Sequence, residues 1–216
     1  MPTPTAQWKF DEGSGTTAID ATGNGNTGTL INGPTYSSDT PTGSGFSLNF
    51  VNTSNTYINV AGPSSPGDCS WMAWMKTSAA ISNMYIMDRS VNKGTISLLN
   101  GKLSALSTGF TGGSYINQAG ADLRTGVWNH IAVVQSGTTL AGYVNAVATG
   151  SASGVQVANV TGVKIGRYGE GFYTFHGLID DVQIYNSALS ASEILQIFSG
   201  SVASRRRRSQ SGSQAL

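Results

Sequence analysis

Short apolar segments separated by turn residues run along most of the chain, and helical periodicity is nearly absent before residue 189. The separating stretches hold Gly62-Pro63, Asn100-Gly101 and Ser136-Gly137, which favour tight reversals of the backbone. Many short strands at this spacing predict an all-β fold, a two-sheet antiparallel sandwich or jelly roll. The apolar segments are 8–10, 46–50, 57–60, 71–75, 84–87, 95–99, 127–134, 140–144, 163–165 and 178–185.

The segment from Trp71 to Met75 is apolar at every position, with the sequence Trp-Met-Ala-Trp-Met. A strand that alternates apolar and polar residues has one face in water, whereas a continuous apolar strand is covered on both faces. This segment is therefore predicted to lie in the middle of a sheet, with material packed on each side.

One short helix is predicted near the end of the chain. Ser190 and Glu193 have the spacing of a capping box, and Leu189 and Ile194 have the spacing of a hydrophobic staple. An apolar stripe follows at Ile194, Ile197 and Phe198. Gly200 suits the position just after a helix, where φ is positive, so the helix is expected to end there and order to end soon after.

Charge is low and unevenly placed. Charged residues make up 11% of the 216 residues, and the net charge is +1. Four of the twelve basic residues are Arg205, Arg206, Arg207 and Arg208, and no acidic residue follows them. Residues 1–204 therefore carry eight basic and eleven acidic residues, a net charge of −3. A nucleic-acid partner is not expected, because that function places a basic face on the domain itself.

The arginine run has several interpretations. It can bind phosphates or an acidic protein surface, since guanidinium pairs with both in a bidentate manner; it can be a protease recognition run or an import signal; or it is a solvated tail. The N-terminus lacks a basic region followed by an apolar region, so no signal peptide is expected. No apolar run has the length needed to span a bilayer.

Three stretches together resemble the laminin G-like domains of the concanavalin A-like lectin/glucanase jelly-roll superfamily. The resemblance covers roughly residues 6–200 and implies a single domain, which we place at residues 1–200. The composition of the remaining residues, 201–216, predicts a basic, low-complexity arm after it. The resemblance also implies that the first and last strands pair. The stretches are WKFDEGSGTTAIDATGNGNTGTL at 8–30, VWNHIAVV at 127–134 and GLIDDVQIYNSALSASEI at 177–194.

Members of such families are mostly binding or structural modules, although some relatives in the wider superfamily are glucanases. Those enzymes present spaced carboxylates of the form Glu-x-Asp-x-x-Glu, which this chain lacks. Asp180 and Asp181 are neighbours in a predicted strand and are expected to point to opposite faces. His130 is expected to be structural, since no Ser or Cys is placed to form a triad with it. No enzymatic activity is expected.

The stretch Asp20–Gly28 is rich in oxygen ligands and in glycines, a composition that suits a calcium ion. Asp20, Asn24 and Asn26 are the candidate ligands, and the resemblance adds Asp181, or Asp180, from the last strand. The alternative is an Asx-rich turn that caps itself and holds no ion. Acids that relatives often carry nearby are replaced here by Val51-Asn52 and Asn145-Ala146, which weakens the case for calcium.

Aromatic residues gather in the glycine-punctuated stretch RYGEGFYTFHG at 167–177. Tyr168, Phe172 and Tyr173 are candidates for stacking on sugar rings or filling a partner's pocket. The alternative is that these side chains cap the edge of the sandwich.

These features favour a non-enzymatic module on the surface of a phage or virus particle, serving in decoration, as a fibre or in adhesion. The basic arm would anchor it to a capsid protein or to neighbouring copies, and the body would contact cell-surface glycans. The virion role is inferred by analogy, because sandwich domains of similar fold and composition suit virion decoration and fibre proteins. Two alternatives stay open: a bacterial carbohydrate-binding or adhesion domain with a structural calcium, found outside the cell or on its surface, and, less favoured, a glucanase-type hydrolase.

Overall fold

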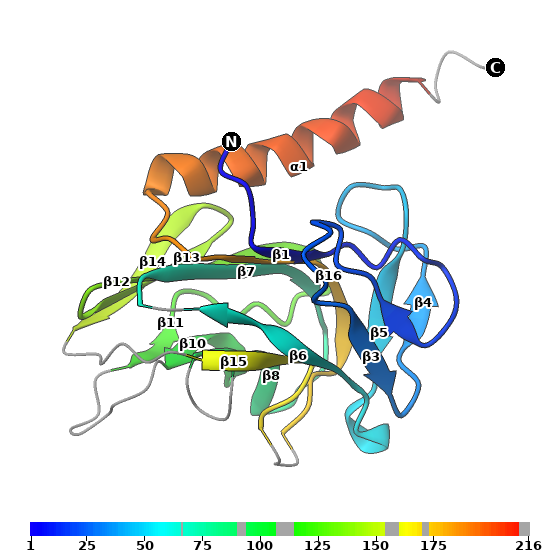
Figure 1. Cartoon of the computed structure of the whole chain (residues 1–216), viewed down its shortest axis with the longest axis horizontal. Helices are drawn as coiled ribbons and strands as arrows, with labels where there is room; N and C mark the ends of the chain where they lie inside the picture. The colour runs from blue at the N-terminus through cyan, green and yellow to red at the C-terminus, as the bar shows by residue number, and fades with distance from the viewer. Residues whose placement is uncertain (66, 90–93, 107–114, 154–159, 170–172, 212–216) are drawn as a thin grey trace.

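Two antiparallel sheets lie face to face, and one helix crosses the outer face of one of them (Figure 1). The computed structural model describes residues 1–65, 67–89, 94–106, 115–153, 160–169 and 173–211. The two facing antiparallel sheets confirm the predicted all-β sandwich. Among the described residues, no helix is both long enough and apolar enough to cross a lipid bilayer.

The sheet beneath the helix, which we call the helix-side sheet, has the strand order β14-β13-β12-β7-β16-β5-β4, with β1 paired to β16. Its strands are β14 (Val147–Ser153), β13 (Thr139–Val144), β12 (Asn129–Ser136), β7 (Cys69–Lys76), β16 (Gly177–Tyr185), β5 (Ser47–Phe50), β4 (Thr35–Ser37) and β1 (Ala6–Trp8).

The other sheet, which we call the opposite sheet, has the order β11-β10-β9-β8-β15-β6-β3-β2. Its strands are β11 (Ile116–Ala119), β10 (Lys102–Leu106), β9 (Thr95–Leu99), β8 (Asn83–Arg89), β15 (Val160–Ile165), β6 (Tyr57–Ser65), β3 (Gly28–Ile31) and β2 (Thr17–Ala18). A 3-10 turn, η1 (Asn52–Ser54), follows β5.

The core fills the space between the sheets with alternate side chains from both. Trp8 and Trp71 are its largest fully buried members, followed by Phe10, Phe50 and Phe175. The pairing of β1 with β16, which aligns Ala6 with Ile184, confirms that the first and last strands meet.

Strand β7 is buried on both faces, as its continuous apolar sequence predicts. Trp71, Ala73 and Met75 point into the core between the sheets. Met72 belongs to a second apolar cluster on the outer face of the sheet, beneath α1 (Ala191–Ser211). Two layers of material therefore enclose this strand, which lies between β12 and β16.

The start of α1 follows the predicted signals. The Ser190 backbone N–H donates to the Glu193 carboxylate (2.8 Å), and the Glu193 N–H donates to the Ser190 hydroxyl (3.3 Å). Leu189 and Ile194 are both buried against the helix-side sheet, and the Phe198 ring stacks on Trp74 with centroids 5.6 Å apart.

The predicted end of this helix at Gly200 is wrong, because α1 continues to Ser211. A single glycine inside a helix costs only about 1 kcal/mol relative to alanine, and the residues that follow, such as Val202, Ala203 and the arginines, accept helical geometry. The arginine run therefore lies on α1, in the half of the helix that rises away from the sheets (Figure 1).

The prediction that Asp180 and Asp181 point to opposite faces is also wrong. The pairing of β16 with β7 shifts register between Asp180 and Gln183, and Asp181 has a φ of 43°. This bulge inserts one extra residue on the outer face, so that Ile179 and Val182 stay in the core while both carboxyl groups line one hollow beside α1.

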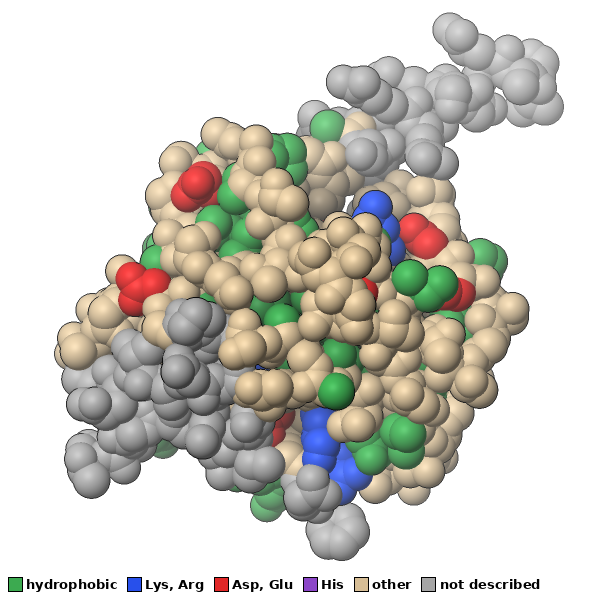
Figure 2. All heavy atoms as spheres, viewed as in Figure 1, with side chains coloured by type: hydrophobic (Ala, Val, Ile, Leu, Met, Phe, Trp, Pro, Cys, Tyr) green, Lys and Arg blue, Asp and Glu red, His purple; other side chains and the backbone are tan. Residues whose placement is uncertain are grey.

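The surface reflects the low charge of the chain. Figure 2 shows scattered acidic and basic side chains on the visible face, among uncharged polar and backbone atoms. Ion pairs between described residues include Lys76–Asp39 and Arg124–Asp122.

His130 should make stability depend on pH. Its ring is 1% exposed beneath α1, against Trp74 and Phe198, and burial lowers its pKa to about 4. Because the folded pKa lies below the unfolded one, the neutral ring stabilises the fold above about pH 6.5. That stability is lost as pH falls toward 4, by up to about 3 kcal/mol.

Urea unfolding between pH 7.5 and pH 4.5 checks this expectation. The variant His130→Phe keeps the ring packing and should lose much less stability over this range than the wild type. His176→Asn changes the second histidine and should behave as the wild type. Equal pH dependence in the wild type and in His130→Phe would contradict the expectation.

Candidate functional site

Asp20, the first candidate calcium ligand, has both carboxylate oxygens hydrogen-bonded by neighbouring protein groups. One oxygen of Asp20 accepts hydrogen bonds from the backbone N–H groups of Gln7 (3.2 Å) and Thr22 (3.0 Å) and from the Thr22 hydroxyl (2.7 Å). Its other oxygen accepts from the backbone and side-chain amides of Asn26, at 3.0 and 2.8 Å. Burial acts to raise the pKa of Asp20, but these bonds outweigh it and hold the pKa below its ordinary value.

The other two candidates do not join Asp20. Asn24 donates its side-chain amide to the Thr5 carbonyl (2.9 Å). Asp181 accepts from the side-chain amides of Gln7 (2.6 Å) and Gln183 (2.8 Å). Both carboxylate oxygens of Asp20 and of Asp181 accept hydrogen bonds, and Asn26 turns its side-chain nitrogen toward Asp20. The set therefore does not fit a calcium ion, which needs six to eight oxygen ligands. Within the described part of the chain, no three acidic, histidine or cysteine side chains come close enough to hold a metal.

The bulge in β16 borders a hollow of about 370 Å³ between α1, the N-terminal residues and the helix-side sheet. We call it the helix hollow. Asp11, Asp180 and Asp181 line it together with Lys9 and Tyr185. The Tyr185 hydroxyl donates to Gln183 (2.5 Å), which in turn donates to Asp181. This chain of bonds holds Asp181 in place on the floor of the hollow.

The two carboxyl groups of the bulge are perturbed by the same environment. Burial, followed by the charge of Asp181, raises the pKa of Asp180 to about 8. Burial also raises the pKa of Asp181, against the hydrogen bonds from Gln7 and Gln183. Two neighbouring buried carboxyls cannot both ionise without a large penalty.

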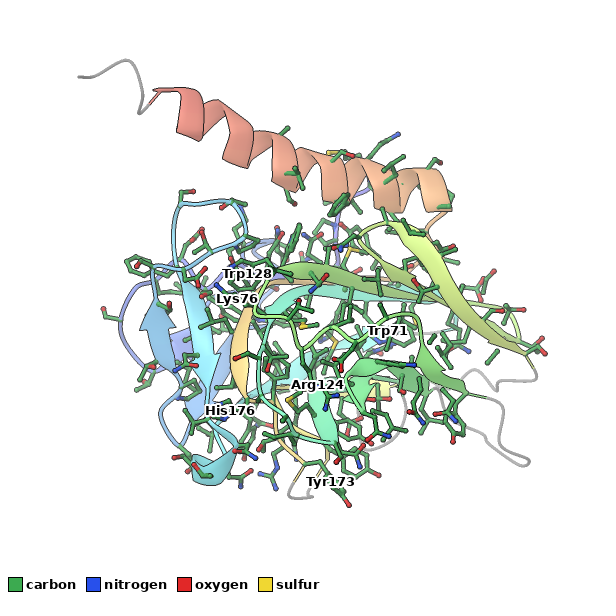
Figure 3. All side chains as sticks on the ribbon, turned by 180° about the vertical axis from the view of Figure 1, so that it is seen from behind. Trp71, Lys76, Arg124, Trp128, Tyr173 and His176 are labelled. Atoms are coloured by element: carbon green, nitrogen blue, oxygen red, sulfur yellow. The ribbon has the colours of Figure 1, made fainter. Side chains whose placement is uncertain are left out.

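The predicted aromatic residues meet a tyrosine that the sequence analysis does not single out. The rings of Tyr85 and Tyr168 lie 4.6 Å apart between centroids, those of Tyr85 and Tyr173 6.1 Å, and those of Tyr168 and Tyr173 6.3 Å. We call these three residues the tyrosine cluster. Tyr173 is 51% exposed and lies on the side of the molecule away from α1 (Figure 3). Phe172, the third predicted aromatic, lies outside the described residues.

A hairpin after β15 holds Tyr168 and Tyr173 in position. The Tyr168 N–H donates to the Tyr173 carbonyl (2.9 Å), which closes the hairpin. The Gly169 N–H donates to the buried Asp88 carboxylate of β8 (2.6 Å), and Lys164 donates to the Gly169 carbonyl (2.9 Å). The turn is therefore tied to two adjacent strands of the opposite sheet.

A second hollow, of about 280 Å³, adjoins the tyrosine cluster. We call it the sheet groove. Tyr85 and Tyr115 border it, and Asn83, Ser97 and Ser104 contribute polar groups. Burial, followed by the neighbouring Tyr168, raises the pKa of Tyr85 to about 12, so its hydroxyl is protonated and can donate a hydrogen bond at any physiological pH.

The signal for Tyr85 was present in the sequence but was local and weak. Asn83 and Tyr85 alternate with the core residues Met84 and Ile86, so both point outward from their strand. Tyr85 meets a hairpin about 85 residues further along the chain because β15 pairs with β8. No local sequence pattern predicts that pairing.

Replacing Asp180 should stabilise the protein at high pH. Because the folded pKa of Asp180 is raised, the stability of the neutral carboxyl is fully present below about pH 4 and is lost as pH rises toward 8. Asp180→Asn keeps an acceptor for the Asp181 N–H (2.7 Å) and removes the charge. We expect it to be about 1–3 kcal/mol more stable than the wild type at pH 8 and nearly equal to it at pH 4. Urea unfolding at both pH values tests this, and an Asn variant that is less stable at pH 8 would be evidence against it.

Comparisons with known structures find the same fold in one domain of an arabinanase and in the binding domains of toxins. Domain 4 of AbnA, an extracellular GH43 arabinanase from Geobacillus stearothermophilus, solved in complex with arabinotriose, is 20% identical with a TM-score of 0.70; the match covers 90% of this chain and 97% of that one. The binding domain of Paraclostridial Mosquitocidal Protein 1 is 16% identical with a TM-score of 0.72, over 90% of this chain and 51% of that one.

The binding domain of botulinum neurotoxin DC, solved in complex with rat synaptotagmin II, is 12% identical with a TM-score of 0.70, over 92% of this chain and 51% of that one. The chain thus spans about half the length of the two toxin domains. At these identities the likeness shows the fold. A search of curated protein sequences finds no match.

The sequence itself matches a family model. Residues 51–195, more than half of the chain, match the Laminin_G_3 family of the concanavalin A-like lectin/glucanases superfamily. The chain therefore belongs to this laminin G-like family and has a lectin-like fold of the concanavalin A type.

Proposed function

We propose that the chain is a non-enzymatic carbohydrate-binding module whose site is the tyrosine cluster with the adjoining sheet groove. One observation carries the proposal: three tyrosine rings meet at Tyr85, and Tyr85 borders a groove that also presents serine hydroxyls and an asparagine amide. Sugar rings have apolar C–H faces and polar edges, so they are bound by aromatic rings that are flanked by a few hydrogen-bonding groups.

The fold supports this proposal at a general level, because the superfamily includes lectins. The arabinanase domain, which carries arabinotriose in its structure, has the same fold over nearly its whole length. Neither fact assigns a sugar to this chain, since function depends on the site and not on the fold.

A glycosidase needs two carboxyl groups that face each other across the substrate, about 5–9.5 Å apart. Here the paired acids Asp180 and Asp181 are consecutive residues of one bulge, and Asp181 accepts hydrogen bonds from two glutamines. Asp180 has the raised pKa of a general acid, but Asp181 has its oxygens engaged and cannot serve as its partner. This geometry supports the non-enzymatic part of the proposal.

The proposal also has an attachment part, in which α1 anchors the module to a larger assembly. The first half of α1 docks on the helix-side sheet, and the backbone of Arg205–Arg208 lies in the half that rises away from it (Figure 1). An arginine run can bind an acidic protein surface, and we propose a virion shell protein as that partner. If the module is instead a bacterial adhesion domain, the glycan site is the same and the arm is not needed.

Alanine at Tyr168 and Tyr173 should remove glycan binding. After a glycan array has identified a ligand, calorimetry should show at least a tenfold loss of affinity for Tyr173→Ala and a larger loss for the double variant. Tyr173→Phe keeps the ring and should retain most of the affinity. Phe46→Ala, an exposed aromatic (37% exposed) before β5 of the helix-side sheet, is the matched control.

Unchanged affinity in the Tyr168→Ala/Tyr173→Ala variant would reject this site. Release of reducing ends from arabinan or β-glucan by the wild-type chain, lost in Asp180→Asn, would reject the non-enzymatic part.

Removal of the arginines should separate attachment from glycan binding. A chain truncated after Ala203 should keep its glycan affinity and should lose binding to a polyglutamate-coated surface, a probe for acidic protein surfaces. Wild-type binding to that surface should weaken steeply between 50 and 300 mM salt, because exposed charges are screened over about 10 Å at 0.1 M. Equal binding of the truncated and full chains would contradict the attachment part.

A further inference from the structure

The sheet groove crosses several strands of the opposite sheet. Strand register places Tyr85 of β8 opposite Ser97 of β9, and Ser97 opposite Ser104 of β10. Tyr115, just before β11, lines the groove with them. Because Ile116 is opposite Ala105, Tyr115 lies beside Leu106 and is displaced along the strands from Ser104. The residues therefore form an oblique row across the strands, from the tyrosine cluster at one end to Tyr115 at the other.

Small side chains create the groove. Ser97 and Ser104 are 7% and 6% exposed and lie at its floor, between the larger side chains of Tyr85 and Tyr115. The floor is fixed by hydrogen bonds: the Ser97 hydroxyl donates to the Ser104 carbonyl (3.2 Å), and the Gln118 N–H donates to the Ser104 hydroxyl (3.0 Å). The depression is thus built into the sheet.

The lining also restricts the charge of the ligand. None of the described residues that line the groove is acidic or basic, so against this lining an ionised carboxylate, sulfate or amine would lose its water without gaining an oppositely charged partner. Neutral hydroxyl groups, by contrast, can bond to the Asn83 amide and to the Tyr85 hydroxyl.

The length of the row restricts the size of the ligand. From β8 to β11 the row spans three strand spacings, about 14 Å, and Tyr168 and Tyr173 extend it beyond β8. One sugar unit advances an oligosaccharide by about one such spacing. We infer that the groove binds a neutral oligosaccharide of three or more units, lying across the strands, with the tyrosine cluster and Tyr115 contacting different units.

This inference rests on the proposed function and adds the ligand's length, charge and direction to it. Its test uses neutral oligosaccharides of one to five units from arabinan, xylan and β-glucan, with affinity measured by calorimetry. We expect affinity to rise at least tenfold from one unit to three and then to level off. A uronic-acid oligomer of three units should bind at least tenfold more weakly than the best neutral trisaccharide.

Two exposed tyrosines distinguish the ends of the groove. Tyr115→Ala, at a residue 40% exposed, should weaken trisaccharide binding about fivefold or more and leave monosaccharide binding unchanged. Tyr173→Ala should weaken binding of both. Urea unfolding of each variant shows whether the fold is kept, and Tyr115→Phe and Tyr173→Phe should restore binding.

The outcomes separate this inference from the function on which it rests. Equal affinity for one and three units, or no effect of Tyr115→Ala on the trisaccharide while Tyr173→Ala still weakens binding, would overturn the extended ligand and keep the glycan site. Equal affinity for the uronic-acid oligomer and the neutral trisaccharide would overturn the inference that the ligand is neutral. No binding of any oligosaccharide would overturn both.

Discussion

The burial of β7 on both faces is the constraint on which the rest of the structure depends. Its inward side chains, among them Trp71 and Met75, join the core between the sheets, while Met72 and Trp74 need cover on the outer face. The capped first turns of α1 supply that cover through Ile194, Ile197 and Phe198. The helix therefore packs on the helix-side sheet, and in the described part of the chain no helix covers the opposite sheet. The outer face of the opposite sheet is left for the tyrosines and the groove.

The parts of the fold that depend on neighbouring residues could be predicted from the sequence. The capping box at Ser190, the apolar run from Trp71 to Met75 and the alternation of short strands and turns each correspond to the structure. The bulge at Asp181 could not be predicted, because its register shift depends on the strand paired with it. The continuation of α1 past Gly200 also escaped prediction, since one glycine ends a helix only where no following residues favour extending it.

The candidate site was predicted in part for the same reason. Tyr168 and Tyr173 stood out as aromatics in a glycine-rich stretch, and the structure brings them together. Tyr85 and the serines of the groove floor have ordinary strand spacing in the sequence. They come together in one site only because β8 pairs with β15 and β9. The oxygen-rich stretch after Asp20 gave a calcium prediction, but hydrogen bonds from Gln7, Thr22 and Asn26 engage both of its carboxylate oxygens. Composition alone could not separate a metal loop from a turn that caps itself.

The helix hollow and the sheet groove differ in character, and the proposed function depends on which of them binds the glycan. The helix hollow is acidic and lies against the docked α1, whereas the sheet groove is uncharged and bordered by tyrosine rings. Nuclear magnetic resonance during titration with the best-binding glycan tests this choice most directly. The account predicts shifts of the backbone signals of Tyr85, Ser97, Ser104 and Tyr173, with those of Gln7, Asp180 and Gln183 unchanged. Shifts confined to the residues of the helix hollow, or to the turn around Asp20, would contradict it.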